Sequence, residues 1–170
     1  AETAKEKGVE GWVFTLQAPS YSPFMTYASN RDLRCKLYIA YNTKCTHDNE
    51  TNNLEIVKKL VNTRLAIAQL LGYSSFAEYN LQERMAENSG NVYKLLDQLL
   101  DAYTPTAKQE YAEVEALARQ LEGSDFTVMP WDWSYYSHKL KDQKFQIDDE
   151  MLRPYFELSK VKEGVFGLDT

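Results

Sequence analysis

The sequence contains few residues that cross-link or break a chain. Its 170 residues include two cysteines, five prolines and seven glycines. Cys35 and Cys45 do not have the spacing of a Cys-x-x-Cys motif. A helix running between them would hold them about 15 Å apart, which is too far for a disulfide bond. We therefore expect two reduced thiols, as in proteins of a cytoplasm-like compartment.

Positive charge and long apolar runs are also lacking. The net charge is −6, whereas proteins that bind nucleic acids usually carry clustered lysine and arginine. No stretch of 18 apolar residues is present, so no membrane-spanning helix is predicted. The first ten residues, AETAKEKGVE, are too charged for the apolar part of a signal peptide. We expect no nucleic-acid partner, no membrane partner and a cytoplasmic location, with export of a longer parent protein left open.

The common catalytic motifs are absent as well. The two histidines, His47 and His138, are followed by aspartate and lysine, so neither begins the His-Glu-x-x-His motif that binds zinc. Cys45 and His47 offer two possible metal ligands, but a closed site needs four. There is no Gly-x-Ser-x-Gly elbow, no Walker loop and no Gly-x-Gly-x-x-Gly loop. The sequence therefore predicts no catalytic residue and no metal ligand within this chain.

The residues that are present favour a soluble helical protein. Hydrophobic residues make up 44% and charged residues 26% of the chain, as in ordinary globular domains. Apolar residues recur with helical spacing between capping residues and glycines. We expect helices over residues 1–7, from Ser22-Pro23 toward Ser29, after Asn30, from Asn52 or Asn53 to Gly72, from Ser75 toward Ala86, from Asn91 to Tyr103, from Thr104-Pro105 to Gly123, after Asp132 and from Ser159. The fold class is all-α, an irregular multi-helix unit with at most one short strand, at residues 12–16 (WVFTL).

Both ends of the sequence have the character of interrupted elements. The helix predicted over residues 1–7 has an end, at Gly8, but no capped beginning. The segment after Ser159 has an apolar side that stops at Thr170 with little of its helix completed. That side consists of Val161, Val165, Phe166 and Leu168. We expect residues 1–170 to be a single helical fragment of a larger protein, truncated at both ends, in which the strand pairs with chain outside this sequence.

An aromatic segment at residues 130–140 (PWDWSYYSHKL) is the strongest candidate for a binding function. Tyrosine is abundant, with twelve residues in the chain, and its ring combines an apolar body with a polar tip. Asp132 is placed to cap a helix whose first turn carries Tyr135 and Tyr136. The segment either packs helices together or forms one wall of a peptide-binding cleft. The candidate substrate-binding residues are Trp131, Asp132, Tyr135 and Tyr136.

Three stretches resemble a known enzyme family. Residues 70–86 (LLGYSSFAEYNLQERMA), 130–140 and 152–166 (LRPYFELSKVKEGVF) are similar in order and spacing to the region upstream of the catalytic motif in the thimet oligopeptidase family. This family includes oligopeptidase A and bacterial peptidyl-dipeptidase. The sequences of the last two stretches resemble peptidyl-dipeptidase most. The resemblance extends from about Lys5 to the last residue.

This resemblance implies a large, mostly helical zinc peptidase whose two lobes face each other across a deep channel. Zinc would be held by the two histidines of His-Glu-x-x-His and a later glutamate, and the glutamate of the motif would activate water. The narrow channel would admit short peptides, from which peptidyl-dipeptidases release C-terminal dipeptides. All of these catalytic residues lie downstream in the family. We therefore expect this chain to be inactive alone and to have short peptides and the remainder of the same polypeptide as partners.

Two other functions are consistent with a helical chain that lacks catalytic residues. The first is a self-contained helical protein-interaction module, and the second is a regulatory pseudo-enzyme. Neither accounts for the three matched stretches. The reading frame beyond Thr170 discriminates between the peptidase and the interaction module. A downstream His-Glu-x-x-His supports the peptidase, and a stop codon supports the module.

Overall fold

The computed structural model describes residues 2–146 and 149–168, which are helical and contain no strand. This confirms the predicted all-α class. The helices are α1 (Glu2–Glu6), α2 (Ala18–Tyr27), α3 (Arg31–Asn42), α4 (Leu54–Leu70), α5 (Phe76–Leu81), α6 (Ser89–Glu122), α7 (Trp133–Phe145), α8 (Asp149–Leu152), the 3₁₀ helix η1 (Arg153–Tyr155) and α9 (Leu158–Gly167). Ala1 and Thr170, which stand at the two ends predicted to be truncated, lie outside the described residues.

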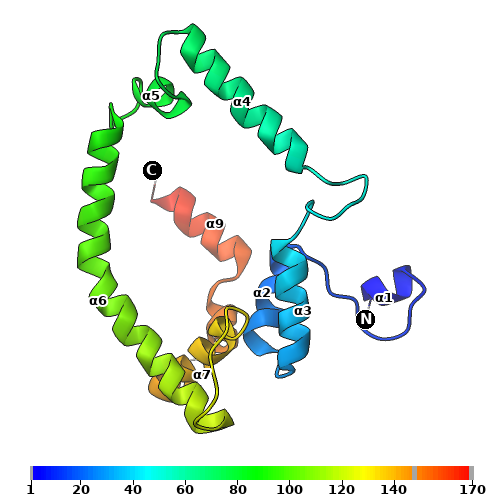
Figure 1. Cartoon of the computed structure of the whole chain (residues 1–170). Coiled ribbons are helices and arrows are strands. Elements are labelled where there is room, and N and C mark those ends of the chain that lie inside the picture. Colours follow the sequence, from blue (N-terminus) through cyan, green and yellow to red (C-terminus); the bar gives the residue numbers. More distant parts are fainter. Residues whose placement is uncertain (1, 147–148, 169–170) are drawn as a thin grey trace.

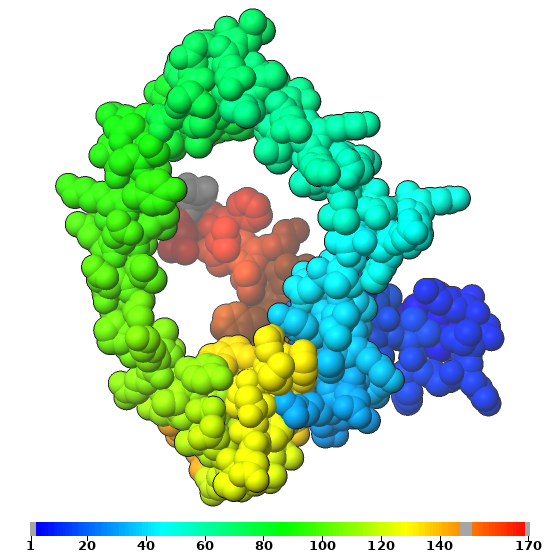
Figure 2. All heavy atoms as spheres, in the orientation of Figure 1, coloured from blue at the N-terminus to red at the C-terminus, as the bar shows by residue number. Residues whose placement is uncertain are grey.

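The helices are arranged as an open ring (Figure 1). Helix α6 forms one long side, and the short helix α5 joins it to α4, which returns toward α3. Helices α2, α3 and α7 close the ring, with α7 packed against both α2 and α6. In the space-filling view the ring has a wide opening, and α9 is seen behind it (Figure 2). Most of the ring is therefore only one helix thick.

Several helix starts follow the predicted capping residues. The Asn30 side chain accepts a hydrogen bond from the Leu33 N–H at 3.0 Å and begins α3. The Ser75 hydroxyl accepts one from the Glu78 N–H at 3.2 Å and begins α5. Only this half of the capping box is formed, because the Glu78 carboxylate accepts a hydrogen bond from the Ser89 hydroxyl at 2.5 Å instead. Local side-chain chemistry thus fixes where these helices begin.

Two predicted helix boundaries at proline are wrong. Helix α2 begins at Ala18, with Pro19 in its first turn, and Pro23 lies inside the helix. Helix α6 runs without a break from Ser89 to Glu122 and contains Pro105. An internal proline removes one backbone hydrogen bond and disfavours the helix, but tertiary context can maintain the helix through it. In each case the helix begins before the position that its proline predicts.

Other helix ends are shifted by a few residues. Asn88, and not Asn91, caps α6, since its side chain accepts a hydrogen bond from the Asn91 N–H at 3.0 Å. Helix α5 ends at Leu81 and does not reach Ala86, because the chain turns there with a hydrogen bond from the Arg84 N–H to the Leu81 carbonyl. These are local differences in turn geometry.

The strand predicted at residues 12–16 does not form. A strand needs a neighbouring chain for its backbone hydrogen bonds, and none lies beside it among the described residues. The Trp12 side chain is 75% exposed, and the Thr15 N–H donates to the Ser20 hydroxyl at 2.9 Å. The segment is therefore an extended connection between α1 and α2.

The C-terminal helix begins one residue before the predicted cap. Helix α9 starts at Leu158, and the Ser159 hydroxyl donates to the Glu157 carboxylate at 2.9 Å. The apolar side expected to be buried is exposed to solvent in this chain. Its residues are Val161, Val165, Phe166 and Leu168.

The hydrophobic core is small and lies where α6 meets α7. It contains Val114 and Ala118 of α6, Val128 of the following loop and Tyr136 of α7. Away from this point, large apolar side chains are exposed along α4 and the first half of α6. On α4 they are Leu54, Ile56, Val57, Leu60, Val61, Leu65, Ile67 and Leu70.

Candidate functional site

The loop between α6 and α7 carries the aromatic segment, and Asp132 lies at its centre. Asp132 immediately precedes α7, but its side chain makes no capping hydrogen bond to that helix. The predicted capping role is therefore wrong. The carboxylate instead accepts a hydrogen bond from the Met129 N–H at 3.0 Å, which closes the turn of its own loop. The backbone of Asp132 is already in the right-handed helical region, unlike the extended backbone of the usual cap.

Two arginines of α3 bind the Asp132 carboxylate. The Arg31 Nη2 lies 2.7 Å from Oδ2, and the Arg34 Nη2 lies 2.8 Å from Oδ1. Arg34 and Asp132 are almost completely buried, whereas the Arg31 side chain is 40% exposed. We call these three residues the Asp132 clamp. It joins α3 to a loop about a hundred positions away in the sequence.

The arginines of the clamp also bind backbone carbonyls on both sides. Arg34 donates to the carbonyls of Ala28 at 2.7 Å and Trp131 at 3.2 Å. Arg31 donates to the carbonyl of Thr127 at 2.9 Å. The hydrogen-bonding capacity of the buried guanidinium is therefore largely used. This arrangement fixes the loop of residues 126–132 against the start of α3.

The charge of Asp132 is maintained by its partners. Burial raises the pKa of the Asp132 carboxyl, but hydrogen bonds from Arg31, Arg34 and the Met129 N–H outweigh this effect. The net pKa lies below its ordinary value, so the carboxylate is ionised at neutral pH. A carboxylate held in this way is poorly suited to act as a general acid or base near neutral pH.

Tyr136 belongs to the core. Its side chain is 2% exposed, and its ring meets that of Phe126 edge-on with the centroids 5.5 Å apart. Its hydroxyl donates to the Glu122 carboxylate at 2.9 Å. Burial raises the pKa of the Tyr136 hydroxyl, and the hydrogen bond to Glu122 raises it further. Tyr136 therefore packs α7 against the end of α6.

Trp131 and Tyr135 are only half-buried. The Arg34 guanidinium lies 4.2 Å from the centre of the Tyr135 ring, and the Lys139 ammonium lies 4.9 Å from it. Trp131 meets the ring of Tyr38, on α3, at 6.1 Å. Of the four candidate substrate-binding residues, Asp132 and Tyr136 are thus enclosed, and Trp131 and Tyr135 retain surface that a ligand can touch.

Sequence reasoning missed Arg31, Arg34 and Tyr38 as members of this site. A signal was present, because arginines three positions apart lie on one face of a helix. Their partner could not be identified from the sequence, since Asp132 was assigned a local capping role.

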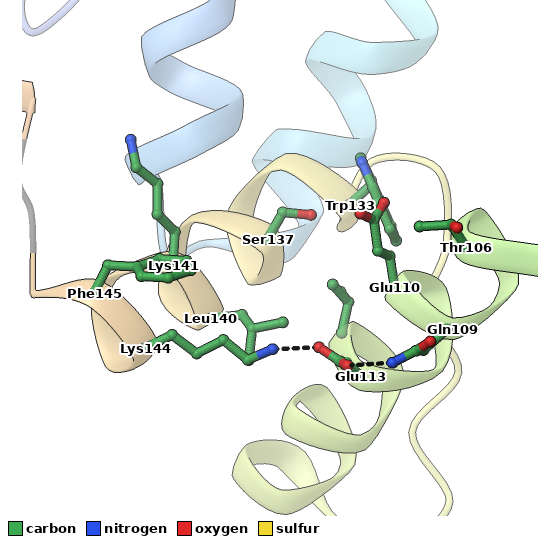
Figure 3. A pocket seen from close by; sticks show the side chains of 11 residues that line it. Thr106, Gln109, Glu110, Glu113, Trp133, Ser137, Leu140, Lys141, Lys144 and Phe145 are labelled. Carbon is green, nitrogen blue, oxygen red and sulfur yellow. Dashed lines mark hydrogen bonds and ion pairs between the residues drawn. The ribbon is translucent and has the colours of Figure 1, made fainter. Parts of the chain in front are cut away.

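A groove of about 450 Å³ lies between α6 and α7 (Figure 3). Trp133, Leu140 and Phe145 line it, and a Glu113–Lys144 ion pair crosses one side. The Ser137 hydroxyl in its wall is buried and finds no hydrogen-bond partner among the residues that the structure describes. The groove combines apolar side chains with the charged residues Glu110, Glu113, Lys141 and Lys144, and none of the described residues that line it is a nucleophile paired with a base.

The histidines do not form a metal site in the described part of the chain. His47 lies 3.2 Å from the Thr43 hydroxyl, and His138 lies 3.2 Å from the Asp142 carboxylate. Over residues 2–146 and 149–168, no three histidine, cysteine, aspartate or glutamate side chains are grouped so that they could hold an ion. These residues therefore do not fit a zinc ion. Cys35 and Cys45 are free thiols, as predicted. None of the described helices is both long and apolar enough to span a membrane.

Comparison with known proteins identifies relatives over almost the whole chain. The model of peptidase family M3 matches residues 24–169. Oligopeptidase A of Haemophilus influenzae is 36% identical over 171 residues, which cover 98% of this chain and 25% of that protein. Oligopeptidase A of Escherichia coli is 37% identical over 167 residues, covering 96% of this chain and 24% of that protein. The dipeptidyl carboxypeptidase of Escherichia coli is 32% identical over 168 residues, covering 98% and 24%.

These matches agree with the resemblance noted in the sequence. The identity is higher to the two oligopeptidase A sequences than to the dipeptidyl carboxypeptidase. Sequence identity therefore does not single out the peptidyl-dipeptidase subfamily, which residues 130–140 and 152–166 resemble most. The chain spans about a quarter of the length of the relatives it matches. Because the family model covers most of its residues, the chain belongs to peptidase family M3.

Proposed function

We propose that this chain is a scaffold segment of a zinc-dependent peptidase that hydrolyses short peptides and releases C-terminal dipeptides. The observation that carries the proposal is the match to peptidase family M3 over residues 24–169, together with relatives named as peptidases. The zinc and the catalytic water would be held by residues outside this chain, because the described residues offer no set of metal ligands. The chain alone is therefore inactive.

The remainder of the same polypeptide is the main partner in this proposal. Helix α4 has large apolar side chains over much of its circumference, and Ala68 is its one buried residue. A helix that is apolar over so wide an arc is normally buried in a protein core. The apolar sides of α9 and of the first half of α6 are exposed in the same way. These surfaces suit further helices of the parent enzyme, and about three quarters of the length of the relatives lies outside the match.

The peptide-binding role falls to Trp131 and Tyr135, with Asp132 and Tyr136 supporting them from behind. The Asp132 clamp fixes the backbone of Trp131, since Arg34 binds both the carboxylate of Asp132 and the carbonyl of Trp131. Rings that are held rigidly can bind a peptide at a low cost in conformational entropy. We place the parent enzyme in the cytoplasm, in agreement with the two free thiols.

The exposed apolar surface of α4 also fits a second function, a helical protein-interaction module. Expression of the full-length parent separates the two. The parent, loaded with zinc, is incubated with N-blocked peptides of different lengths, and the products are identified by mass spectrometry. The expected result is release of C-terminal dipeptides that a chelator abolishes and added zinc restores.

The chain of residues 1–170 alone, treated identically, serves as the control and should give no chelator-sensitive cleavage. Cleavage at internal bonds would keep the peptidase and replace the product assignment. If the parent cleaves no peptide under any of these conditions, the helical protein-interaction module becomes the better supported function.

A further inference from the structure

Three aromatic side chains continue the surface of Trp131 along α2 and α3. Trp131 meets the Tyr38 ring at 6.1 Å, and Tyr41 stacks on Tyr21 with the ring centroids 4.1 Å apart and the planes 22° apart. Tyr38 and Tyr41 lie three positions apart on α3 and therefore share one face of it. We call Trp131, Tyr38, Tyr41 and Tyr21 the aromatic strip. All four are half-buried.

The three tyrosine hydroxyls of the strip are not enclosed. Burial raises the pKa of the Tyr21 hydroxyl, and its neighbours Tyr38 and Tyr41 raise it further. None of them has a hydrogen-bond partner among residues 2–146 and 149–168. The three oxygens are not buried either. Among the described residues, the Ser137 hydroxyl is the one buried side-chain oxygen that lacks a hydrogen-bond partner, and no tyrosine hydroxyl belongs to that class. The rings are thus packed and their polar tips reach the surface.

A positive charge lies at one end of the strip. The Lys44 ammonium is 3.7 Å from the centre of the Tyr41 ring, a cation–π contact. Lys44 makes no ion pair with any described residue. It can therefore bind a carboxylate without first giving up another partner.

We propose that the aromatic strip binds the main chain of an extended peptide whose carboxylate lies at the Lys44 end. A tyrosine hydroxyl both donates and accepts, so it can bind a peptide carbonyl or a peptide N–H. Tyr38 and Tyr41 are about 5 Å apart along α3, and an extended peptide rises roughly 3.3 Å per residue, so these two side chains together span one to two residues of a substrate. The strip includes Trp131, one of the two residues to which we assign peptide binding, and the inference rests on the proposed peptidase function.

The test uses the zinc-loaded full-length parent and its variants Tyr38→Phe, Tyr41→Phe and the double variant. Each loses one hydroxyl and keeps its ring. We expect KM and the calorimetric Kd for an N-blocked peptide to rise about three- to tenfold per hydroxyl, with kcat and Tm close to those of the wild type. Tyr155→Phe, in the exposed 3₁₀ helix η1, is the matched control and should change none of these values.

The role of Lys44 is tested with Lys44→Gln. The wild type should bind a peptide with a free C-terminal carboxylate, or with an acidic side chain near that end, more tightly than its amidated neutral counterpart. The variant should lose this preference, and the peptide that shows it identifies which carboxylate is bound.

The results separate the inference from the proposed function. An active parent whose KM and Kd are unchanged in the double variant would overturn the strip while the peptidase stands. A lower Tm with unchanged Kd would also overturn it, because the hydroxyls would then serve only the packing. If the parent cleaves nothing, the peptidase proposal fails, and calorimetry alone decides whether the strip binds peptides.

Discussion

The guanidinium of Arg34 and the carboxylate of Asp132 form a buried ion pair, with Nη2 2.8 Å from Oδ1, although 98 positions separate them in the sequence. Both side chains are almost completely removed from solvent. A buried pair of this kind need not be more stabilising than apolar residues of the same shape, but the loss of one partner leaves an uncompensated charge. The pair therefore makes the position of the 126–132 loop strongly dependent on α3.

Removing Asp132 should be more costly than a capping role implies. A lost helix cap would cost about 0.5–2 kcal/mol, whereas Asp132→Ala in the full-length parent should cost about 3–5 kcal/mol because Arg34 stays buried without its partner. Denaturant unfolding followed by circular dichroism measures the difference. Asp125→Ala, in the same loop and exposed, is the control and should change the free energy of unfolding by less than about 0.5 kcal/mol. A loss for Asp132→Ala within the capping range would contradict the clamp.

The stability of the parent should depend on the ionisation of Asp132 in acid. The pKa of Asp132 in the folded protein lies below its unfolded value. Its contribution is therefore fully present above the unfolded pKa of about 3.9 and is lost as the pH falls from there through the folded pKa. Asp132→Asn lacks this titration. The Tm difference between wild type and Asp132→Asn should be constant from pH 7 to about pH 5 and should narrow below about pH 4; a difference independent of pH would show that the charge contributes nothing.

Tyr135 and Tyr136 should respond differently to the same substitutions. Tyr136→Phe removes the hydrogen bond to Glu122 and should cost about 0.5–1.5 kcal/mol, and Tyr136→Ala should cost about 3–5 kcal/mol through the cavity it leaves. Neither Tyr136→Phe nor the folded population of Tyr136→Ala should show a changed KM, because this ring is enclosed. Tyr135→Phe should leave Tm unchanged and raise KM in the parent enzyme. The opposite pattern for the two tyrosines would reverse their assigned roles.

The chain of residues 1–170 should associate with itself when it is separated from the rest of the enzyme. Exposed apolar side chains on α4 and α9 have no partner within the described residues, and large patches of this kind promote association. Sedimentation should show oligomers and a hydrophobic dye should bind. Val57→Glu and Val61→Glu, on one side of α4, should reduce both signals, while Lys58→Glu beside them should not. A monomer that binds no dye would contradict the assignment of these faces as internal surfaces of the parent.

The features that could be predicted from the sequence are those determined by neighbouring residues. Asn30 and Ser75 begin α3 and α5 as expected, because a cap and its N–H partner lie three positions apart. The helix start predicted at Pro105 is wrong, because a rule based on neighbouring residues cannot show that the surrounding structure maintains α6 across this proline. The capping role predicted for Asp132 is wrong for a related reason. A capping motif was recognisable in the sequence, but the competing arginines on α3 were brought to it only by the fold.

The continuity of α6 through Pro105 has a consequence for how this segment can vary in length. A helix of 34 residues is a rod roughly 50 Å long, and each added residue advances it about 1.5 Å and turns it about 100°. Inserting one residue would swing α4 and α5 around the axis of α6 by more than a quarter of a circle and would point their apolar faces away from the parent. Adding seven residues, about two turns, would restore the direction and only widen the ring. Length changes that preserve the enzyme should therefore come in whole turns of α6, and single insertions should be confined to the loops on either side of it.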